Sequence, residues 1–287
     1  MPVIDFHVHI GGPEDLKPWV MTFFANFGKG SGAEEVVDEK GRMSPEALVD
    51  LLRKNGIDYA VILAELSPIT TGMISNERVA EFCEGRRELI PFANLNPYLS
   101  TQLGQELERC VRDLKMKGIK LYPTYQQFYP NDRTLYPLYA KAQDLKIPVM
   151  VHTGSSLFRG SRMKYGDPVL LDDVAVDFPD LTLIQVHSGR GFWYAAAFFL
   201  AQLHANVYME IAGLPPQNLL KYFPDLEKNA DKILFGSDWP GVPGIGKNVE
   251  AIRALPIKEE TKEKILGENA ARILGISSPQ KSPRTLR

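Results

Sequence analysis

The sequence is poor in the features that mark several common protein classes. Its 287 residues include two cysteines, Cys83 and Cys110, which form no C-x-x-C pair and are too few for a disulfide framework. The 33 lysines and arginines nearly balance the 35 aspartates and glutamates, and no dense basic stripe is present, so the electrostatic footprint of a nucleic-acid binder is missing. The longest apolar stretch, 192–203, is too short to span a bilayer.

The first ten residues also lack the charged and then apolar pattern of a secretory signal, since they already contain Asp5, His7 and His9. Together with the two unpaired cysteines, this favours a cytoplasmic protein. We expect its partners to be small organic molecules, and neither nucleic acid nor a membrane. Helical patterns as apolar as 192–204 would suit the surface of a homodimer, and a well-covered helix of a barrel would show the same pattern.

What the sequence does contain is a regular alternation of apolar, β-branched runs with amphipathic helical patterns. This alternation is typical of βα units and a parallel sheet. Eight units in a chain of this length predict an α/β protein with a single (β/α)8 barrel, a TIM barrel, over residues 1–276. The strands are expected near 3–9, 58–64, 89–95, 118–122, 147–152, 181–187, 206–211 and 232–237.

Helix signals and long connections complete the predicted fold. Ser44, Pro45 and Glu46 predict the start of one helix, and Ser100 is expected to cap another that runs to about Lys117. An extra C-terminal helix over about 258–274 is expected on the barrel exterior, followed by a flexible tail over 277–287. Three long connections leave the carboxyl ends of strands, which is the active-site face of such barrels. They cover 10–43, 123–134 and 153–167.

Histidine is scarce, and four of the five histidines end predicted strands at that face. They are His7 and His9 on strand one, His152 on strand five and His187 on strand six. His7 and His9 are two residues apart, so both imidazoles face the same side of the strand and can bind one ion. This clustering predicts a metal site, whereas His204 lies in a helical stretch and is expected to be a surface or structural residue.

Two aspartates fit the same site. Asp238 follows the eighth predicted strand and would supply an anionic ligand that also accepts a proton. An aspartate in that place is commonly only a helix cap, so its assignment depends on the whole set of residues. Asp5, two residues before His7, is expected either to hold a ligand imidazole in place or to be a structural carboxylate lower in the barrel.

Lys120 ends the fourth predicted strand, and its role is open. A buried lysine beside a cation is costly unless it is neutralised or paired. It could carry a carbamate that bridges two metals, or pair with a substrate carboxylate. The third alternative is a rim lysine whose ammonium group reaches water.

Short segments in a fixed order resemble the amidohydrolase superfamily, and in particular its amidohydrolase-related branch, which includes ACMSD-like decarboxylases. The resemblance covers nearly the full length, and its segments are 4–9 (IDFHVH), 118–123 (GIKLYP), 148–154 (PVMVHTG), 187–189 (HSG), 235–240 (FGSDWP) and 267–274 (GENAARIL).

The resemblance implies a ligand set. It implies that His7, His9, His152 and Asp238 bind one divalent ion, most often Zn²⁺, with Mn²⁺ or Fe²⁺ as alternatives. His187 would then handle a proton of the metal-bound water or of the substrate. Members with two metals use a carboxylated lysine at the position of Lys120 and recruit the histidine at 187; we expect the single-metal form.

The expected chemistry follows from a metal-activated water, whose pKa falls to about 7, with Asp238 and His187 as proton carriers. We expect a metal-dependent hydrolase of an amide, lactone or ester of a small, carboxylate-bearing molecule. The alternative is a metal-dependent non-oxidative decarboxylase of a cyclic or aromatic acid. A third reading is a catalytically silent barrel that acts as a binding protein.

Aromatic and cationic residues of the long connections predict the substrate contacts. Aromatic walls with one or two guanidinium groups suit a small organic acid. Arg190 and Trp239 are preferred because each lies within a few residues of a catalytic candidate. The full set of expected contacts is Lys120, Tyr122, Arg159, Arg190 and Trp239, with Trp19, Phe23, Phe24, Phe27, Tyr125, Phe128 and Tyr129 as further aromatic residues of the rim.

Overall fold

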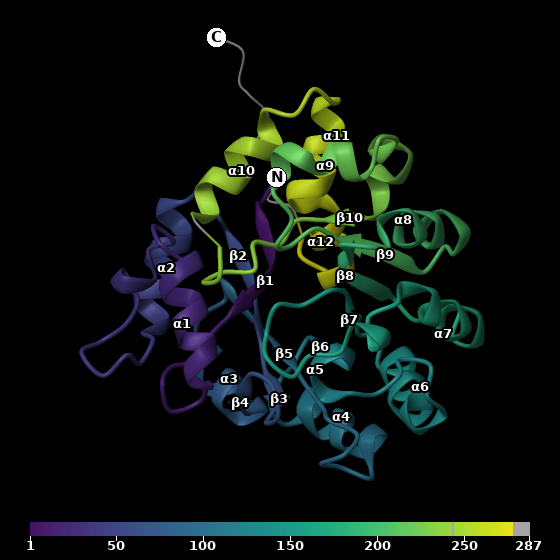
Figure 1. The fold of residues 1–287 in the computed structure, drawn as a ribbon, viewed down its shortest axis with the longest axis horizontal. Coiled ribbons are helices and arrows are strands. Elements are labelled where there is room, and N and C mark those ends of the chain that lie inside the picture. The colour runs from purple at the N-terminus through teal and green to yellow at the C-terminus, as the bar shows by residue number, and fades with distance from the viewer. Residues whose placement is uncertain (243, 278–287) are drawn as a thin grey trace.

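The computed structural model describes residues 1–242 and 244–277, and its centre is a cylinder of parallel strands surrounded by helices (Figure 1). All eight predicted strands are present, and they pair in chain order. The strands are β1 (Ile4–His9), β2 (Tyr59–Leu63), β5 (Leu89–Ala93), β6 (Gly118–Leu121), β7 (Val149–Gly154), β8 (Leu183–Arg190), β9 (Val207–Glu210) and β10 (Ile233–Leu234).

The first strand and the segment that follows β10 bring the two edges of the sheet together. The Phe6 amide donates to the Phe235 carbonyl over 2.9 Å, and the Asp238 amide donates to the His7 carbonyl over 3.0 Å. The His9 amide donates to the Trp239 carbonyl over 2.8 Å. The predicted (β/α)8 barrel is therefore confirmed.

Helices alternate with the strands, as the sequence pattern predicts. They are α1 (Pro18–Phe27), α2 (Pro45–Lys54), α3 (Asn76–Cys83), α4 (Leu103–Arg112), α5 (Pro123–Gln126), α6 (Tyr136–Asp144), α7 (Leu171–Asp177), α8 (Tyr194–Leu203), α9 (Leu219–Tyr222), α10 (Ile245–Arg253), α11 (Glu259–Glu263) and α12 (Asn269–Leu274).

Two predicted helix starts have different outcomes. Ser44 caps α2 as expected, because its Oγ accepts from the Ala47 amide over 3.2 Å. The prediction that Ser100 caps the next helix is wrong. Its amide donates to the Asn96 carbonyl in a turn that closes before the helix, and α4 begins at Leu103. The same helix ends at Arg112, not near Lys117.

The C-terminal helix closes the bottom of the barrel, whereas we expected it on the exterior. This helix consists of α11 and α12, which are joined by a π-helical turn over Lys264–Glu268. Within the turn, the Ile265 carbonyl accepts from the Phe235 amide over 2.9 Å. The diverted carbonyl accounts for the wider turn. The helix then contributes to an apolar cluster inside the cylinder, which consists of Ile4, Phe6, Val61, Leu63, Ile90, Phe92, Met150, Ile184, Val186, Leu234, Ala270 and Ala271.

A small antiparallel hairpin that was not predicted follows β2. Its strands are β3 (Glu65–Ser67) and β4 (Gly72–Ile74). The first long connection lies against it, since the Lys17 amide donates to the Thr71 carbonyl over 2.8 Å. The hairpin therefore covers one side of the active-site face and brings polar residues there.

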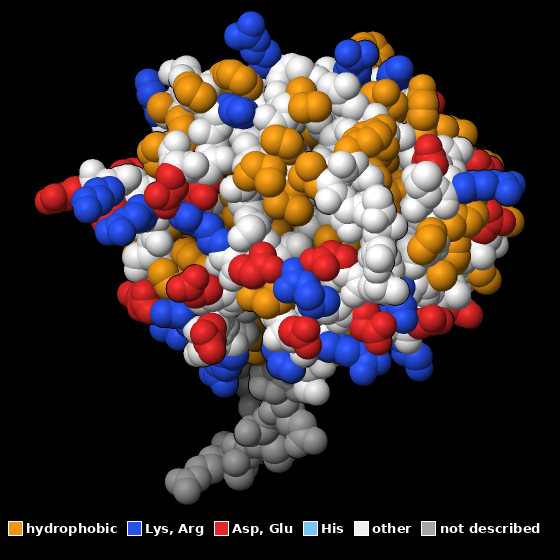
Figure 2. All heavy atoms as spheres, turned by 90° about the horizontal axis from the view of Figure 1, so that it is seen from below, with side chains coloured by type: hydrophobic (Ala, Val, Ile, Leu, Met, Phe, Trp, Pro, Cys, Tyr) orange, Lys and Arg blue, Asp and Glu red, His pale blue; other side chains and the backbone are white. Residues whose placement is uncertain are grey.

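The outer surface is uneven. On the face shown in Figure 2, apolar side chains gather in the upper half and charged side chains in the lower half. In the described part of the chain, no helix combines the length and the apolar character needed to cross a membrane. The homodimer stays a prediction, and the predicted tail over 277–287 lies outside the described residues except for residue 277.

Candidate metal centre

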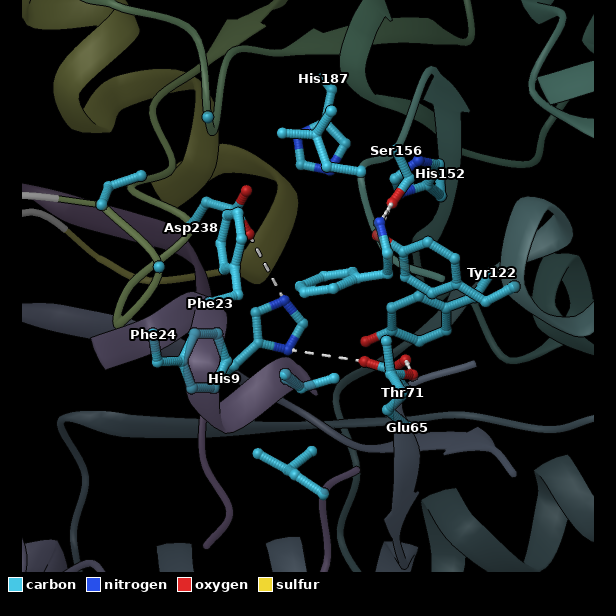
Figure 3. A pocket seen from close by; sticks show the side chains of 18 of the residues that line it. His9, Phe23, Phe24, Glu65, Thr71, Tyr122, His152, Ser156, His187 and Asp238 are labelled. Carbon is cyan, nitrogen blue, oxygen red and sulfur yellow. Dashed lines mark hydrogen bonds and ion pairs between the residues drawn. The ribbon is translucent and has the colours of Figure 1, made fainter. Parts of the chain in front are cut away.

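The candidate metal centre forms where β1 meets the segment after β10. His7 Nε2 lies 3.0 Å from His9 Nε2, and Asp238 Oδ1 lies 3.3 Å from the former and 3.5 Å from the latter. His187 joins them, because ligand atoms of His7, His187 and Asp238 lie within 4.8 Å of one another. Figure 3 shows His9, His187 and Asp238 directed toward the same cavity.

His152, at the end of β7, completes the group of strand-end histidines. Its ring centroid lies 4.7 Å from that of His187. Its Nε2 is buried and has no hydrogen-bond partner within residues 1–242 and 244–277. Buried polar atoms are seldom left unpaired, so this nitrogen fits a ligand for a group that the protein binds. The five residues predicted for the metal site and its proton transfer are thus gathered at one end of the barrel.

Irregular backbone directs several of these side chains. The register between β1 and β2 shifts between Asp5 and Val8. His187 and Asp238 have φ angles of 62° and 70°, in the left-handed region that costs energy for residues other than glycine. Such irregularities change the direction of a side chain and cluster at functional sites. The backbone strain at both residues is consistent with a functional role.

The protonation states suit metal binding. Burial, followed by neighbouring positive groups, holds the pKa of His7, His152 and His187 well below the usual value, so the rings are neutral. His187 Nδ1 donates to the Ala212 carbonyl over 2.7 Å, which leaves Nε2 free to act as a ligand or proton acceptor.

Asp238 provides the negative charge of this group. Burial alone would raise its pKa, but the surrounding imidazoles, with His7 first, outweigh burial and hold the pKa well below the usual value. Neutral imidazoles and an ionised carboxylate are the donor states that a divalent ion requires. The residues therefore fit such an ion.

Glu210 is part of the site, and the sequence reasoning missed it. Its Oε1 lies 3.3 Å from His7 Nδ1. Its carboxylate also accepts the His187 and Ala212 amides, both over 3.1 Å, and burial raises its pKa to about 8. Glu210 ends the otherwise apolar β9, and a charged residue at the end of a buried strand was the signal available in the sequence.

Asp5 occupies a different place from the one we preferred. Its Oδ1 accepts the His7 amide over 3.1 Å and the Ser237 amide over 2.8 Å. It thereby ties the backbone of β1 to the segment after β10. The prediction that Asp5 holds a ligand imidazole is wrong, because Glu210 faces the His7 ring; the structural alternative agrees with these contacts.

Glu65 was also missed, since the hairpin that carries it was not predicted. Its Oε2 lies 3.9 Å from His9 Nδ1, and its Oε1 accepts from the Thr71 hydroxyl. Figure 3 shows Glu65 and Asp238 on opposite sides of the His9 ring.

Lys120 lies inside the barrel next to the histidines. Its Nζ is 2.6 Å from His7 Nε2 and 4.5 Å from the centroid of the Tyr122 ring. The residue is 1% exposed, and burial lowers its pKa to about 8. The rim-lysine alternative is wrong for this reason, while the carbamate and the substrate pairing stay open.

A cavity of about 290 Å³ opens above the histidines. Lys120, Tyr122 and Arg190 line it, as expected of substrate contacts. Arg190, at the end of β8, is held by the connection after β7, because its Nε and Nη2 donate to the Ser155 carbonyl over 3.2 and 3.0 Å. Its Nη1 lies 3.7 Å from Asp238 Oδ2, so a guanidinium group flanks the carboxylate within the cavity.

Two expected substrate contacts are wrong. Trp239 is 0% exposed, and its Nε1 donates to the Ser31 carbonyl over 3.0 Å, so the indole is a core residue. The guanidinium of Arg159 lies 5.7 Å from the Trp19 ring, and the residue is not among those of the described chain that line the cavity. Proximity in the chain misled both predictions, since side-chain direction decides which neighbours of a catalytic residue face the substrate.

His204 lies apart from this site, as expected. Its Nε2 is 2.6 Å from Asp172 Oδ1, in a pair on the outer side of the barrel.

Comparison with known proteins identifies the family to which this chain belongs. A family model described as amidohydrolase matches residues 4–276. This chain belongs to the amidohydrolase family. The resemblance seen in the sequence, including the branch that contains the decarboxylases, is confirmed.

The similar proteins include enzymes that act on aromatic acids. A gamma-resorcylate decarboxylase of Rhizobium sp. (strain MTP-10005) is 26% identical over 249 residues, which cover 70% of this chain and 75% of that protein. An uncharacterized TIM-barrel protein from Bordetella bronchiseptica is 27% identical with a TM-score of 0.80, covering 96% of this chain and 99% of the other.

A more distant match shows the fold alone. The 5-carboxyvanillate decarboxylase of Novosphingobium aromaticivorans DSM 12444, whose structure contains manganese and 4-hydroxy-3-methoxy-5-nitrobenzoic acid, is 16% identical. Its TM-score is 0.70, with 96% of both chains covered.

Proposed function

We propose that this amidohydrolase is a metal-dependent, non-oxidative decarboxylase of a small aromatic acid. The observation that carries the proposal is a single cavity that joins the imidazole and carboxylate cluster to two cationic side chains, Lys120 and Arg190, and to aromatic walls. The similar protein from Rhizobium sp. (strain MTP-10005) named above is a gamma-resorcylate decarboxylase, which supports the decarboxylase over the hydrolase. Hydrolysis, which we ranked first from the sequence, becomes the alternative.

In this proposal one divalent ion is held by His7, His9, His152 and Asp238. When bound, the ion supplies Lewis acidity toward the oxygen atoms of the substrate. Imidazole and carboxylate donors suit both Zn²⁺ and Mn²⁺. Manganese is the first ion to test, because a solved structure of the same fold contains it.

The two cations bind and orient the acid. Arg190 offers Nη1 to the cavity, since its other donors are engaged by the Ser155 carbonyl. Lys120 offers its ammonium group from the floor, next to His7. Tyr122 and Tyr125, whose rings are stacked at 5.7 Å, supply a flat apolar side for the ring of the substrate.

Asp238 carries the proton. When the carbon–carbon bond breaks, its electron pair stays on the ring carbon, CO₂ leaves, and one proton must reach that carbon. The low pKa keeps Asp238 ionised between turnovers, so it does not store this proton but relays one that solvent supplies, passing it on to the carbon and returning to the carboxylate. Arg190 Nη1, 3.7 Å from Oδ2, stabilises the carboxylate that remains, and His187 is the neighbouring group that can exchange the proton with solvent.

A two-sided assay tests this function. Protein reconstituted with Mn²⁺ or Zn²⁺ is offered gamma-resorcylate, 5-carboxyvanillate and other aromatic acids, and CO₂ release is measured beside the cleavage of lactones and esters. We expect metal-dependent CO₂ release from at least one acid, with one bound ion per chain. Ester or lactone cleavage without CO₂ release would replace the proposal by the hydrolase, and two ions per chain would favour a carboxylated Lys120.

A further inference from the structure

The cavity has a polar floor and an apolar outer wall. The floor is made by side chains at the strand ends, among them Lys120, His152 and Asp238. The outer wall comes from the connections above the strands: Val20, Phe23 and Phe24 from α1, Ile74 from β4, and Leu157 and Phe158 from the connection after β7.

Aromatic contacts make this outer wall continuous with the floor. The Phe158 ring lies 5.0 Å from Phe23 and 5.9 Å from Tyr125, and Tyr125 lies 4.9 Å from His152. The hydroxyl groups near this path are already engaged, since Ser156 Oγ donates to the Tyr125 hydroxyl over 3.0 Å. A group that rises from the floor along this path therefore meets rings and methyl groups.

The cavity is larger than a single aromatic ring requires. An apolar cavity of about 150 Å³ accommodates a benzene molecule. The cavity of about 290 Å³ is roughly twice that size. A carboxylated ring seated on the floor thus leaves space for a further apolar group against the outer wall.

We propose that the substrate is an aromatic acid with an apolar substituent of about three carbons or more, which the outer wall binds. The inference rests on the proposed function, because the floor must bind the carboxylate for the substituent to point outward. Phe23, Phe24 and Phe158 are then the residues that determine specificity. They select among acids by the apolar surface they bury and do not touch the reacting carbon.

Binding of simple analogues tests the inference. Protein reconstituted with Mn²⁺ is titrated with benzoate, 3-propylbenzoate and 4-propylbenzoate in a calorimeter. Each buried methylene is worth about a fourfold gain in affinity, so we expect at least one propyl isomer to bind about tenfold or more tightly than benzoate. Phe158→Ala removes the centre of the wall and should lower that ratio to about threefold or less.

Three further variants control the result. Phe199→Ala removes a phenylalanine that is 60% exposed on α8, and it should keep the wild-type ratio. Phe158→Leu retains an apolar side chain and should restore most of the ratio. Phe23→Ala tests the same wall independently if Phe158→Ala does not fold.

The failures of the two proposals can be told apart. If benzoate binds and neither propyl isomer gains affinity, the outer wall does not select an apolar group and this inference is overturned, while the decarboxylase stands. The same conclusion follows if Phe199→Ala lowers the ratio as much as Phe158→Ala. If no aromatic acid binds and none releases CO₂, the proposed function is overturned and the inference with it.

Discussion

The lower and upper layers of the barrel interior are built on the same strands but hold opposite kinds of side chains. The lower layer consists of apolar residues such as Phe6 and Phe92, whose rings meet edge to face at 5.6 Å. The upper layer holds histidines, Lys120 and carboxylates, and within the described chain it includes buried polar atoms without partners, such as His152 Nε2. The lower layer is thus a packed apolar core, whereas the upper layer keeps polar atoms available to bind a ligand.

The change between the layers occurs within one strand. On β1, Phe6 packs in the lower cluster, and the next residue, His7, contacts Lys120 and Asp238 in the upper one. Strict alternation would place neighbours on opposite faces, and the register shift between Asp5 and Val8 removes that alternation. The lower layer therefore provides stability and the upper layer provides the chemistry. We expect a substitution in one layer to change stability or activity, but not both.

The largest effect should come from Asp238→Asn in the upper layer. The amide can neither act as an anionic ligand nor carry the proton, and removing a proton carrier alone typically costs about 10²–10⁴-fold in rate. We expect CO₂ release to fall by about 10³-fold or more and the bound metal to decrease, with the unfolding midpoint nearly unchanged. Retained activity would remove Asp238 from the mechanism.

The second-largest effect is expected for Phe92→Ala in the lower layer, which should lower stability and leave activity nearly unchanged. Deleting a buried phenylalanine leaves a cavity and costs about 3–5 kcal/mol of unfolding free energy. The measurement is denaturant unfolding, together with CO₂ release per folded molecule, which should stay within about threefold of the wild type. If activity per folded molecule collapses while stability does not, the two layers are not independent.

A smaller effect is expected for Glu210→Gln, which replaces the carboxylate beside His7 Nδ1 with an amide. Loss of such a partner typically lowers metal affinity by about 10–100-fold. Competition with a chelator measures the dissociation constant directly. Glu250→Gln, at an exposed glutamate on α10, is the matched control and should leave it unchanged. Equal metal affinity in the two variants would show that Glu210 does not support the His7 ring.

The smallest effect should come from Arg159→Ala. Its guanidinium stacks over Trp19 away from the cavity, so we expect catalytic efficiency within about twofold of the wild type and stability within about 0.5 kcal/mol. Arg190→Ala is the informative partner, because it removes a cavity cation and should raise KM for the acid by about tenfold or more. Similar KM values for the two variants would contradict the assignment of Arg190 to the carboxylate.

The sequence was sufficient to predict the eight strands, the barrel and the histidines at its rim. These features depend on local periodicity and on the fact that parallel strands end on one face, so they can be read without knowledge of contacts. The position of Lys120 at the end of a strand and the capped start of α2 at Ser44 could also be predicted, because both depend on the local sequence alone.

Only the tertiary structure revealed Glu210 and Glu65 beside the histidines and removed Trp239 and Arg159 from the cavity. The direction of a side chain at a strand end depends on bulges, on left-handed residues such as His187 and Asp238, and on which loop covers the rim. The C-terminal helix shows the same limit, since its amphipathic pattern demands an apolar partner without specifying that this is the open bottom of the barrel. These features arise from contacts between segments far apart in the chain, which no local pattern records.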